Sequence, residues 1–238
     1  MSSTKTGSST SSKSPLKRTI SPGAFKDDPA AVKVILCDLG NVLLHFDHRI
    51  AVRRIQPYCT KSFEEIYQLF FDSPFTKDYE EGRIGTADFF KHVTGALAAP
   101  ELQYEEFCAA WSDIFFDSGE MLAWLKELKK DFRLHLVSNI NELHYAFIRK
   151  NFSDHIAVFD DIFLSYEIGH RKPHREIYER AIRASGFDVS QCLYIDDRED
   201  LVAAAREMGI RSIVFKNVAA CRQELQEMGL WPQKKASF

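Results

Sequence analysis

The sequence lacks the features that mark membrane and nucleic-acid-binding proteins. Its 238 residues are 45% hydrophobic, but no stretch approaches the roughly 18 consecutive apolar residues of a membrane span, and runs such as 34–37 have the length of a strand. The formal charge is −3, so no surplus of positive charge attracts nucleic acid or an anionic membrane. We therefore expect a soluble, folded chain whose partner is a small molecule rather than a nucleic acid or a membrane.

Cysteine pairs at metal-binding spacing are also missing. The chain has five cysteines, an odd number, at widely spaced positions and without any Cys-x-x-Cys: Cys37, Cys59, Cys108, Cys192 and Cys221. This usage argues against both a disulfide framework and a zinc site. We expect reduced, mostly buried thiols and a cytoplasmic location.

The first 30 residues differ in composition from the rest. Twelve of the first 22 are Ser or Thr, and five basic residues precede position 27 without any acidic one. Such a segment buries too little apolar surface to offset the entropy of ordering it, so we expect residues 1–30 to form a disordered tail. An organellar transit peptide is the alternative, but the segment has no amphipathic apolar face.

After the tail, strand-like and helix-like segments alternate. The expected strands cover residues 32–37, 132–137, 161–164, 192–195 and 211–215, and the expected helices cover 118–130, 141–151, 175–185, 199–208 and 219–228. Each strand is short and apolar enough to be buried on both faces. This alternation predicts an α/β fold with a mainly parallel sheet, formed by residues 31–47 and 118–238.

One stretch, residues 48–117, interrupts the alternation. It contains helical patterns and no convincing strand, so we expect an inserted helical subdomain. A capping box at Ser62–Glu65 opens an aromatic-rich helix, and residues 86–97 and 104–115 supply two more apolar faces.

Polar side chains follow the expected strands. These residues are Asp38 after the first strand, Ser138 and Asn139 after the second, Lys172 in a loop before the fourth, and Asp196 and Asp197 after the fourth. The carboxyl ends of parallel strands meet at one edge of a sheet, where ligands bind. Three neighbouring carboxylates repel one another unless a divalent cation neutralises them, and oxygen ligands suit Mg²⁺. Lys172 and Ser138 are then suited to holding phosphate oxygens.

Four motifs follow one another along the chain: ILCDLGNVL at 35–43, LVSN at 136–139, HRKP at 170–173 and YIDD at 194–197. In this order they resemble the four motifs of the haloacid dehalogenase (HAD) superfamily, and the resemblance covers about residues 32–230. The first motif, together with YEEGRI at 79–84, is similar to the branch of sugar-1-phosphate phosphatases related to α-D-glucose-1-phosphate phosphatase. The resemblance implies a Rossmann-like parallel sheet in which residues 48–117 form a helical cap.

The resemblance also implies roles for the motif residues. Asp38 would be the catalytic nucleophile that forms an aspartyl-phosphate. Asp38, the Gly40 carbonyl and Asp197, with Asp196 beside them, would hold Mg²⁺. Ser138, Asn139 and Lys172 would bind the substrate's phosphate, and Lys172 would also be catalytic.

The chain departs from the superfamily's usual pattern in two ways. Most of its phosphatases carry a second Asp as general acid and base where this chain has Gly40. Losing such a group costs ~10²–10⁴-fold in rate, which is tolerable when the leaving group is a weak base, as in an anomeric phosphate. Glu199, Asp47 and His45 are alternative sources of the proton. The other departure is Arg198 and Leu201, where relatives often have Asn.

These features predict a Mg²⁺-dependent phosphomonoester hydrolase that acts on a small organic phosphate, such as a sugar phosphate. Three alternatives stay open: a haloacid dehalogenase-like hydrolase, an isoprenoid-phosphate phosphatase, and an inactive phospholigand-binding module. The paired Asp196 and Asp197 argue against the dehalogenase, because those enzymes need no metal. Gly40 and Leu201 motivate the inactive module.

Overall fold

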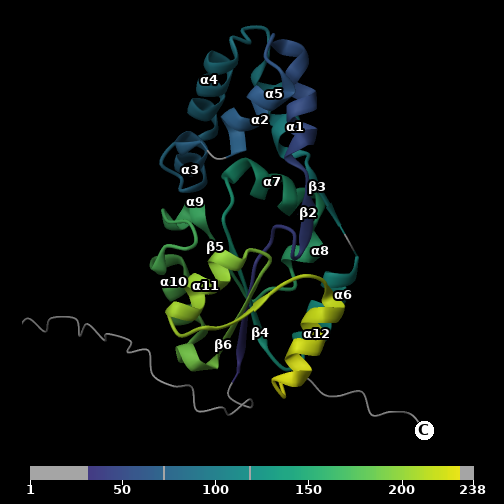
Figure 1. The fold of residues 1–238 in the computed structure, drawn as a ribbon, viewed down its shortest axis with the longest axis vertical. Helices are drawn as coiled ribbons and strands as arrows, with labels where there is room; N and C mark the ends of the chain where they lie inside the picture. The colour runs from purple at the N-terminus through teal and green to yellow at the C-terminus, as the bar shows by residue number, and fades with distance from the viewer. Residues whose placement is uncertain (1–31, 72, 118, 231–238) are drawn as a thin grey trace, which may run out of the picture.

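The computed structural model describes residues 32–71, 73–117 and 119–230. It has a parallel sheet flanked by helices, with a bundle of further helices at one end of the molecule (Figure 1). The predicted tail, residues 1–30, lies outside the described residues. Within them, no helix is both long and apolar enough to cross a membrane.

The sheet has five strands in the order β5-β4-β1-β6-β7. They are β1 (Val34–Cys37), β4 (Arg133–Ser138), β5 (Asp161–Leu164), β6 (Cys192–Asp196) and β7 (Arg211–Val214). All four pairings are parallel, and Cys37 at the end of β1 lies opposite Leu136 on one side and Ile195 on the other. The predicted α/β class with a parallel sheet is confirmed.

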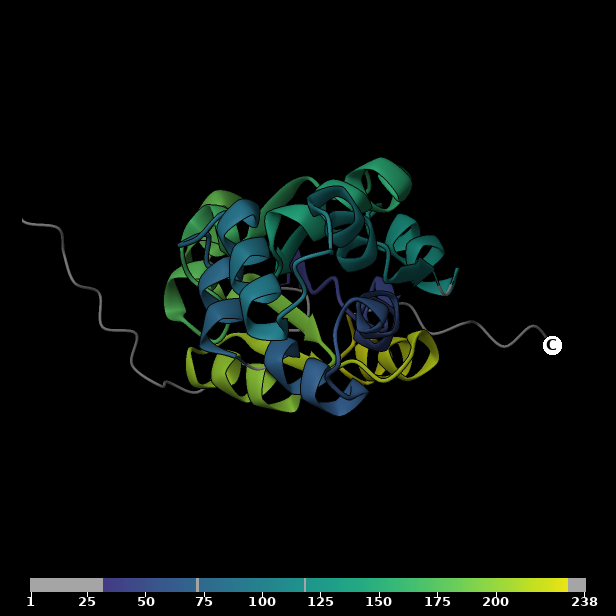
Figure 2. The same ribbon diagram turned by 90° about the horizontal axis from the view of Figure 1, so that it is seen from above.

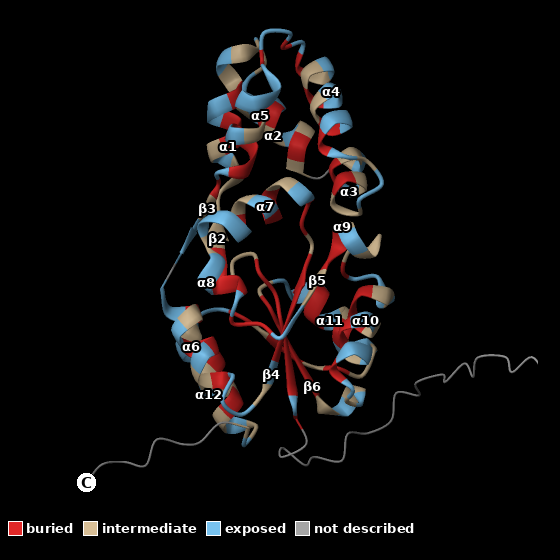
Figure 3. Ribbon diagram, turned by 180° about the vertical axis from the view of Figure 1, so that it is seen from behind, coloured by how far each residue is buried: buried red, intermediate tan, exposed pale blue. Residues whose placement is uncertain are grey.

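Helices cover both faces of the sheet, so every residue of its central strands except Arg133 is buried. On one face lie α6 (Glu120–Leu128), α7 (Glu142–Asn151) and α12 (Val218–Glu227), and on the other lie α10 (Arg175–Ser185) and α11 (Glu199–Glu207). Alternate residues of β1 enter the two apolar clusters, Ile35 the first and Leu36 the second. Figure 3 shows the helices turning their buried sides toward the strands.

Short helical segments occupy some of the connections. They are the one-turn helices α8 (Ser153–Ile156) and α9 (Ser165–Ile168) and the 3-10 turns Gln56–Tyr58 and Val189–Gln191. Of these, α9 follows β5 directly and lies beside α3 (Pro74–Glu80) of the bundle (Figure 1).

The bundle at the end of the molecule has an apolar cluster of its own. Its helices are α1 (His48–Ile55), α2 (Phe63–Phe71), α3 (Pro74–Glu80), α4 (Thr86–Leu97) and α5 (Tyr104–Ser112), seen from above in Figure 2. Rings such as Phe70, Phe89 and Trp111 fill its centre. The predicted capping box is present, since Ser62 N donates to Glu65 Oε2 at 2.8 Å and Glu65 N donates to Ser62 Oγ at 3.3 Å.

The expectation that residues 48–117 contain no strand is wrong. Strand β3 (Phe115–Asp117) pairs antiparallel with β2 (Leu44–Phe46), so the helix predicted to reach Phe115 ends earlier, at Ser112. Asp113 has left the helical conformation, with φ −87° and ψ 67°. The two strands precede α1 and follow α5, and they therefore form the double connection between sheet and bundle.

Candidate active site

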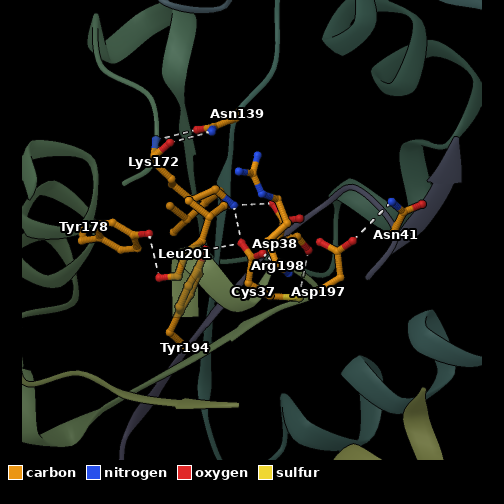
Figure 4. A network of polar contacts seen from close by, with 12 residues as sticks. Cys37, Asp38, Asn41, Asn139, Lys172, Tyr178, Tyr194, Asp197, Arg198 and Leu201 are labelled. Atoms are coloured by element: carbon orange, nitrogen blue, oxygen red, sulfur yellow. Dashed lines mark hydrogen bonds and ion pairs between the residues drawn. The ribbon is translucent and has the colours of Figure 1, made fainter. Parts of the chain in front are cut away.

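Residues of the candidate site gather beyond the carboxyl ends of β1, β4 and β6 (Figure 4). Asp38 follows β1 directly and remains fixed to β6, because its N–H donates to the Ile195 carbonyl at 2.9 Å. Ser138 is the buried last residue of β4, and Asp196 is the buried last residue of β6. The parallel register thus brings together groups that are far apart in the sequence.

The Lys172 ammonium lies at the centre of this group. Its Nζ donates to Asp38 Oδ1 at 2.5 Å, to Asp196 Oδ2 at 2.8 Å and to the Val137 carbonyl at 2.9 Å. Only 1% of its side chain is exposed, so all three donors of the ammonium are satisfied inside the protein. Burial opposes the charge, but the two carboxylates outweigh it and raise the pKa of Lys172.

Asn139 joins the two loops that flank this ammonium. Its Nδ2 donates to the Lys172 carbonyl at 2.9 Å, and the Lys172 N–H donates to its Oδ1 at 2.7 Å. Both ends of the amide are therefore bonded to the main chain of Lys172. The predicted residue lies at the site, and this pair of bonds sets the position of Lys172 relative to β4.

The three predicted carboxylates do converge. Ligand oxygens of Asp38, Asp196 and Asp197 all lie within 4.8 Å of one another. Burial raises the pKa of Asp38, Lys172 opposes the rise, and Asp196 and Asp197 add to it, so that the pKa lies at about 7. Burial, followed by Asp196, also raises the pKa of Asp197. A divalent cation would relieve this repulsion, and a set of carboxylate oxygens fits Mg²⁺.

Hydrogen bonding separates the roles that the three carboxylates can play. Asp196 has both oxygens engaged, Oδ2 by Lys172 and the Tyr194 hydroxyl and Oδ1 by the Arg198 N–H at 2.9 Å. Asp38 is engaged through Oδ1, and Asp197 accepts from Asn41 through Oδ2 at 3.3 Å. The geometry favours Asp38 and Asp197 as metal ligands and Asp196 as the counter-ion of Lys172.

Phe46 explains why a side chain is missing at position 40. A Cβ placed on Gly40 would lie 2.7 Å from Phe46 Cε1, so the ring already fills the space into which a second Asp would project. The alternative proton donors have other contacts. Asp47 caps α1 by accepting from the Arg49 N–H at 2.9 Å, and the His45 ring lies 5.7 Å from that of Phe116 on the β2–β3 pair. Glu199 is exposed on the first turn of α11.

The sequence analysis did not identify Tyr194, which contacts two residues of the site, Asp196 and Lys172. It lies on β6 two residues before Asp196, its hydroxyl donates to Asp196 Oδ2, and its ring lies 5.6 Å from Lys172 Nζ. Strand alternation places residues two apart on the same face, so this signal was present in the sequence. Leu201, at one of the positions where relatives often have Asn, is buried and brings no polar side chain to the site. In this chain the Tyr194 hydroxyl supplies a polar contact to Asp196.

Comparisons with known proteins agree with this geometry. A family model described as haloacid dehalogenase-like hydrolase matches residues 32–209. A D-ribitol-5-phosphate phosphatase of Bacteroides thetaiotaomicron is 28% identical over 204 residues, which cover 82% of this chain and 97% of that protein. A sesquiterpene phosphatase of Aspergillus oryzae is 22% identical over 64% of this chain and 78% of its own length.

Solved structures give the same result. A HAD family enzyme of Bacteroides thetaiotaomicron, crystallised with magnesium and inorganic phosphate, matches with a TM-score of 0.70 and 25% identity, over 80% of this chain and 98% of that one. The L-2-haloacid dehalogenase of Xanthobacter autotrophicus matches in fold, with a TM-score of 0.57 and 15% identity over 84% of this chain and 85% of that one.

The contact between Gly40 and Phe46 predicts that Gly40→Ala is destabilising. Overpacking of this kind costs about 1–3 kcal/mol, which urea unfolding measures directly. Gly95→Ala is the matched control, because a Cβ on Gly95 in α4 meets nothing within 4 Å and Ala favours a helix. Equal stability of Gly40→Ala and the wild type would show that the Phe46 ring does not limit position 40.

The bond from Tyr194 to a buried carboxylate predicts that Tyr194→Phe lowers the free energy of unfolding by about 1.5–3 kcal/mol. Tyr79→Phe is the comparison, since this buried hydroxyl is bonded to the neutral Thr86 hydroxyl at 2.7 Å and its loss should cost only about 0.5–1.5 kcal/mol. Urea titration of both metal-free variants measures the difference. Equal losses would contradict a special role for the Tyr194 hydroxyl.

Proposed function

This chain belongs to the haloacid dehalogenase-like hydrolase family, and on that premise we propose that it is a Mg²⁺-dependent phosphatase of small organic phosphates. The observation that carries the proposal is the cluster of Asp38, Asp196 and Asp197 around the buried ammonium of Lys172. The relative named as a ribitol-phosphate phosphatase and the similar enzyme crystallised with magnesium and phosphate support it.

In the proposed reaction, the Asp38 carboxylate attacks phosphorus in line with the leaving oxygen, the bond between phosphorus and that oxygen breaks, and Asp38 becomes an aspartyl-phosphate. The leaving oxygen takes a proton from solvent and departs as the alcohol. Water then attacks phosphorus and gives a proton back to solvent, the bond between phosphorus and Asp38 breaks, and inorganic phosphate and the free carboxylate result. The first step needs an ionised Asp38 carboxylate. Burial disfavours this charged form, and the Lys172 ammonium 2.5 Å away favours it. Gly40 offers no side chain to protonate the leaving oxygen, which favours substrates whose leaving group is a weak base.

The remaining residues hold the reacting groups in place. Asp38 and Asp197, with the predicted Gly40 carbonyl, would hold Mg²⁺, which supplies positive charge for the phosphoryl oxygens. Asp196 keeps Lys172 beside Asp38, and Asn139 fixes the main chain of Lys172 to the end of β4. Ser138, buried at that end, is proposed to contact the phosphate, as is Lys172.

We also propose that residues 48–117 act as the cap of this site and residues 31–47 and 118–238 as its core. The bundle of α1 to α5 has its own apolar cluster and connects to the sheet through the β2–β3 pair, as a subdomain that covers a site requires. Many of its aromatic rings pack against one another: Phe70, Tyr79, Phe89 and Trp111 are at most 2% exposed.

The expected cytoplasmic location stays a prediction. All five cysteines are free, and Cys37, Cys192 and Cys221 are buried, as the sequence predicted. This state suits a reducing compartment. The absence of a nucleic-acid partner also stays a prediction, based on the charge of −3.

Phosphate release from a panel of sugar, polyol and isoprenoid phosphates tests the proposal. We expect Mg²⁺-dependent turnover that EDTA abolishes and that added Mg²⁺ restores, because three carboxylates cannot bind a phosphate dianion unaided. Asp38→Asn should lower kcat by on the order of 10³-fold or more, since it removes the nucleophile. Asp113→Asn, which changes an exposed carboxylate paired with Arg54 at 2.9 Å, should leave kcat unchanged.

Other outcomes of the panel identify the alternatives. Turnover that survives EDTA, or full turnover by Asp38→Asn, rules out the mechanism. Preference for an isoprenoid phosphate selects that substrate class. Halide release from a haloacid indicates the dehalogenase, and Mg²⁺-linked binding without phosphate release indicates a binding module.

A further inference from the structure

The end of α3 contacts the loops that carry the candidate phosphate-binding residues. We propose that Glu80 in the bundle is a positioning residue, which holds Arg171 and thereby sets the position of Lys172 for catalysis. This inference rests on the proposed phosphatase function. It assigns the turn at residues 80–82 a role in aligning the bundle with the phosphate site.

The first contact is an ion pair between the bundle and the core. Glu80 Oε2 lies 2.6 Å from Arg171 Nε, and the two side chains are only 20% and 22% exposed. Arg171 immediately precedes Lys172, so a displacement of Arg171 is passed directly to the main chain of Lys172. Removing one partner of such a pair leaves the other charge without compensation in a partly buried place.

The second contact involves the same main chain. The Arg171 N–H donates to Glu81 Oε1 at 3.2 Å, and Glu81 Oε2 is held in turn by Arg83 at 2.7 Å. Two consecutive carboxylates at the end of α3 therefore hold Arg171, one by its guanidinium and the other by its backbone. This double contact fixes both position and orientation of the residue next to Lys172.

The third contact connects the end of α3 to the loop after β4, the second of the two loops that carry candidate phosphate-binding residues. Ser165 Oγ donates to the Glu80 carbonyl at 2.6 Å and accepts from the Ile140 N–H at 2.9 Å. Gly82 has φ +66°, and a Cβ there would lie 2.1 Å from the Tyr166 carbonyl oxygen, so only glycine permits this approach. The turn at residues 80–82 thus contacts α9 directly, and through Ser165 it is connected to the loop after β4.

The two phosphate loops are themselves joined. Asn139 bonds to both the N–H and the carbonyl of Lys172. A continuous series of contacts therefore runs from the Glu80 carboxylate through its ion pair with Arg171, along the chain to Lys172, and through two hydrogen bonds to Asn139. The loop between α3 and α4 is also held to the core at its other end, because Glu142 Oε1 in α7 accepts from the Thr86 N–H at 2.8 Å.

A positioning role makes a different prediction from a purely structural one. If Glu80 only attached the bundle, its loss would lower stability without changing how the folded enzyme handles phosphate. If Glu80 sets Lys172, the folded variant should lose kcat and also affinity for inorganic phosphate, since misplacement of a charged group by about 1 Å can cost up to ~10²-fold.

The test compares Glu80→Gln with Asp88→Asn in the full-length protein. Asp88 is the matched control, because its carboxylate lies in the same bundle, on the first turn of α4, and pairs only with the exposed Lys91 at 3.5 Å among the ion pairs of the described residues. We expect Glu80→Gln to lower kcat about 10- to 100-fold and to weaken binding of inorganic phosphate, measured by calorimetry with Mg²⁺ present, by a similar factor. Asp88→Asn should change neither quantity.

A double variant tests whether the ion pair carries the effect. Glu80→Gln with Arg171→Gln should lose no more activity than the worse single variant, because either change already breaks the pair. Additive losses, or a folded Glu80→Gln with unchanged kcat and phosphate affinity, would overturn the proposal. If Glu80→Gln does not fold, Arg171→Lys replaces it, and failure of both to fold would overturn the proposal in favour of a stability role.

The phosphate-binding measurement also separates this inference from the proposed function. If the wild type releases no phosphate from the panel, the phosphatase proposal fails. Weaker phosphate binding by Glu80→Gln, with Asp88→Asn unaffected, would still support the link from Glu80 to Lys172.

Discussion

The buried ammonium of Lys172 is the interaction on which the candidate site depends. It binds Asp38 after β1, Asp196 at the end of β6 and the Val137 carbonyl in β4, so one charge joins three neighbouring strands. A charge that is 1% exposed is stable only with such partners, and the partners are equally costly without it. Two surrounding contacts stabilise this arrangement: the Tyr194 hydroxyl donates to Asp196, and Asn139 bonds to the main chain of Lys172.

Much of this arrangement could be predicted from the sequence, because simple rules of parallel sheets determine it. Short apolar segments alternating with amphipathic helices predicted the five strands, and each differs by at most two residues at either end. Since parallel strands end at one edge, Asp38, Ser138 and Asp197 had to lie close together. Strand alternation would also have placed Tyr194 beneath Asp196.

Other features arise from contacts through space and leave no local pattern. The β2–β3 strands have three residues each, too few for an alternation to be recognised. Gly40 looked like a missing catalytic group, whereas the structure shows the Phe46 ring in the space that a side chain would need. Glu81 and Arg171 are 90 residues apart, so nothing in the sequence indicated that the end of α3 would meet the loop of Lys172.

The central claim is that Asp38 accepts the phosphoryl group. Its most direct test is to mix the enzyme with Mg²⁺ and a substrate that it hydrolyses and to quench the mixture in acid within the first turnover. The peptide containing Asp38 is then examined by mass spectrometry. The account predicts a phosphoryl group on Asp38 that appears before inorganic phosphate and then decays. Phosphate release without any phosphoryl group on that peptide at any time would contradict it.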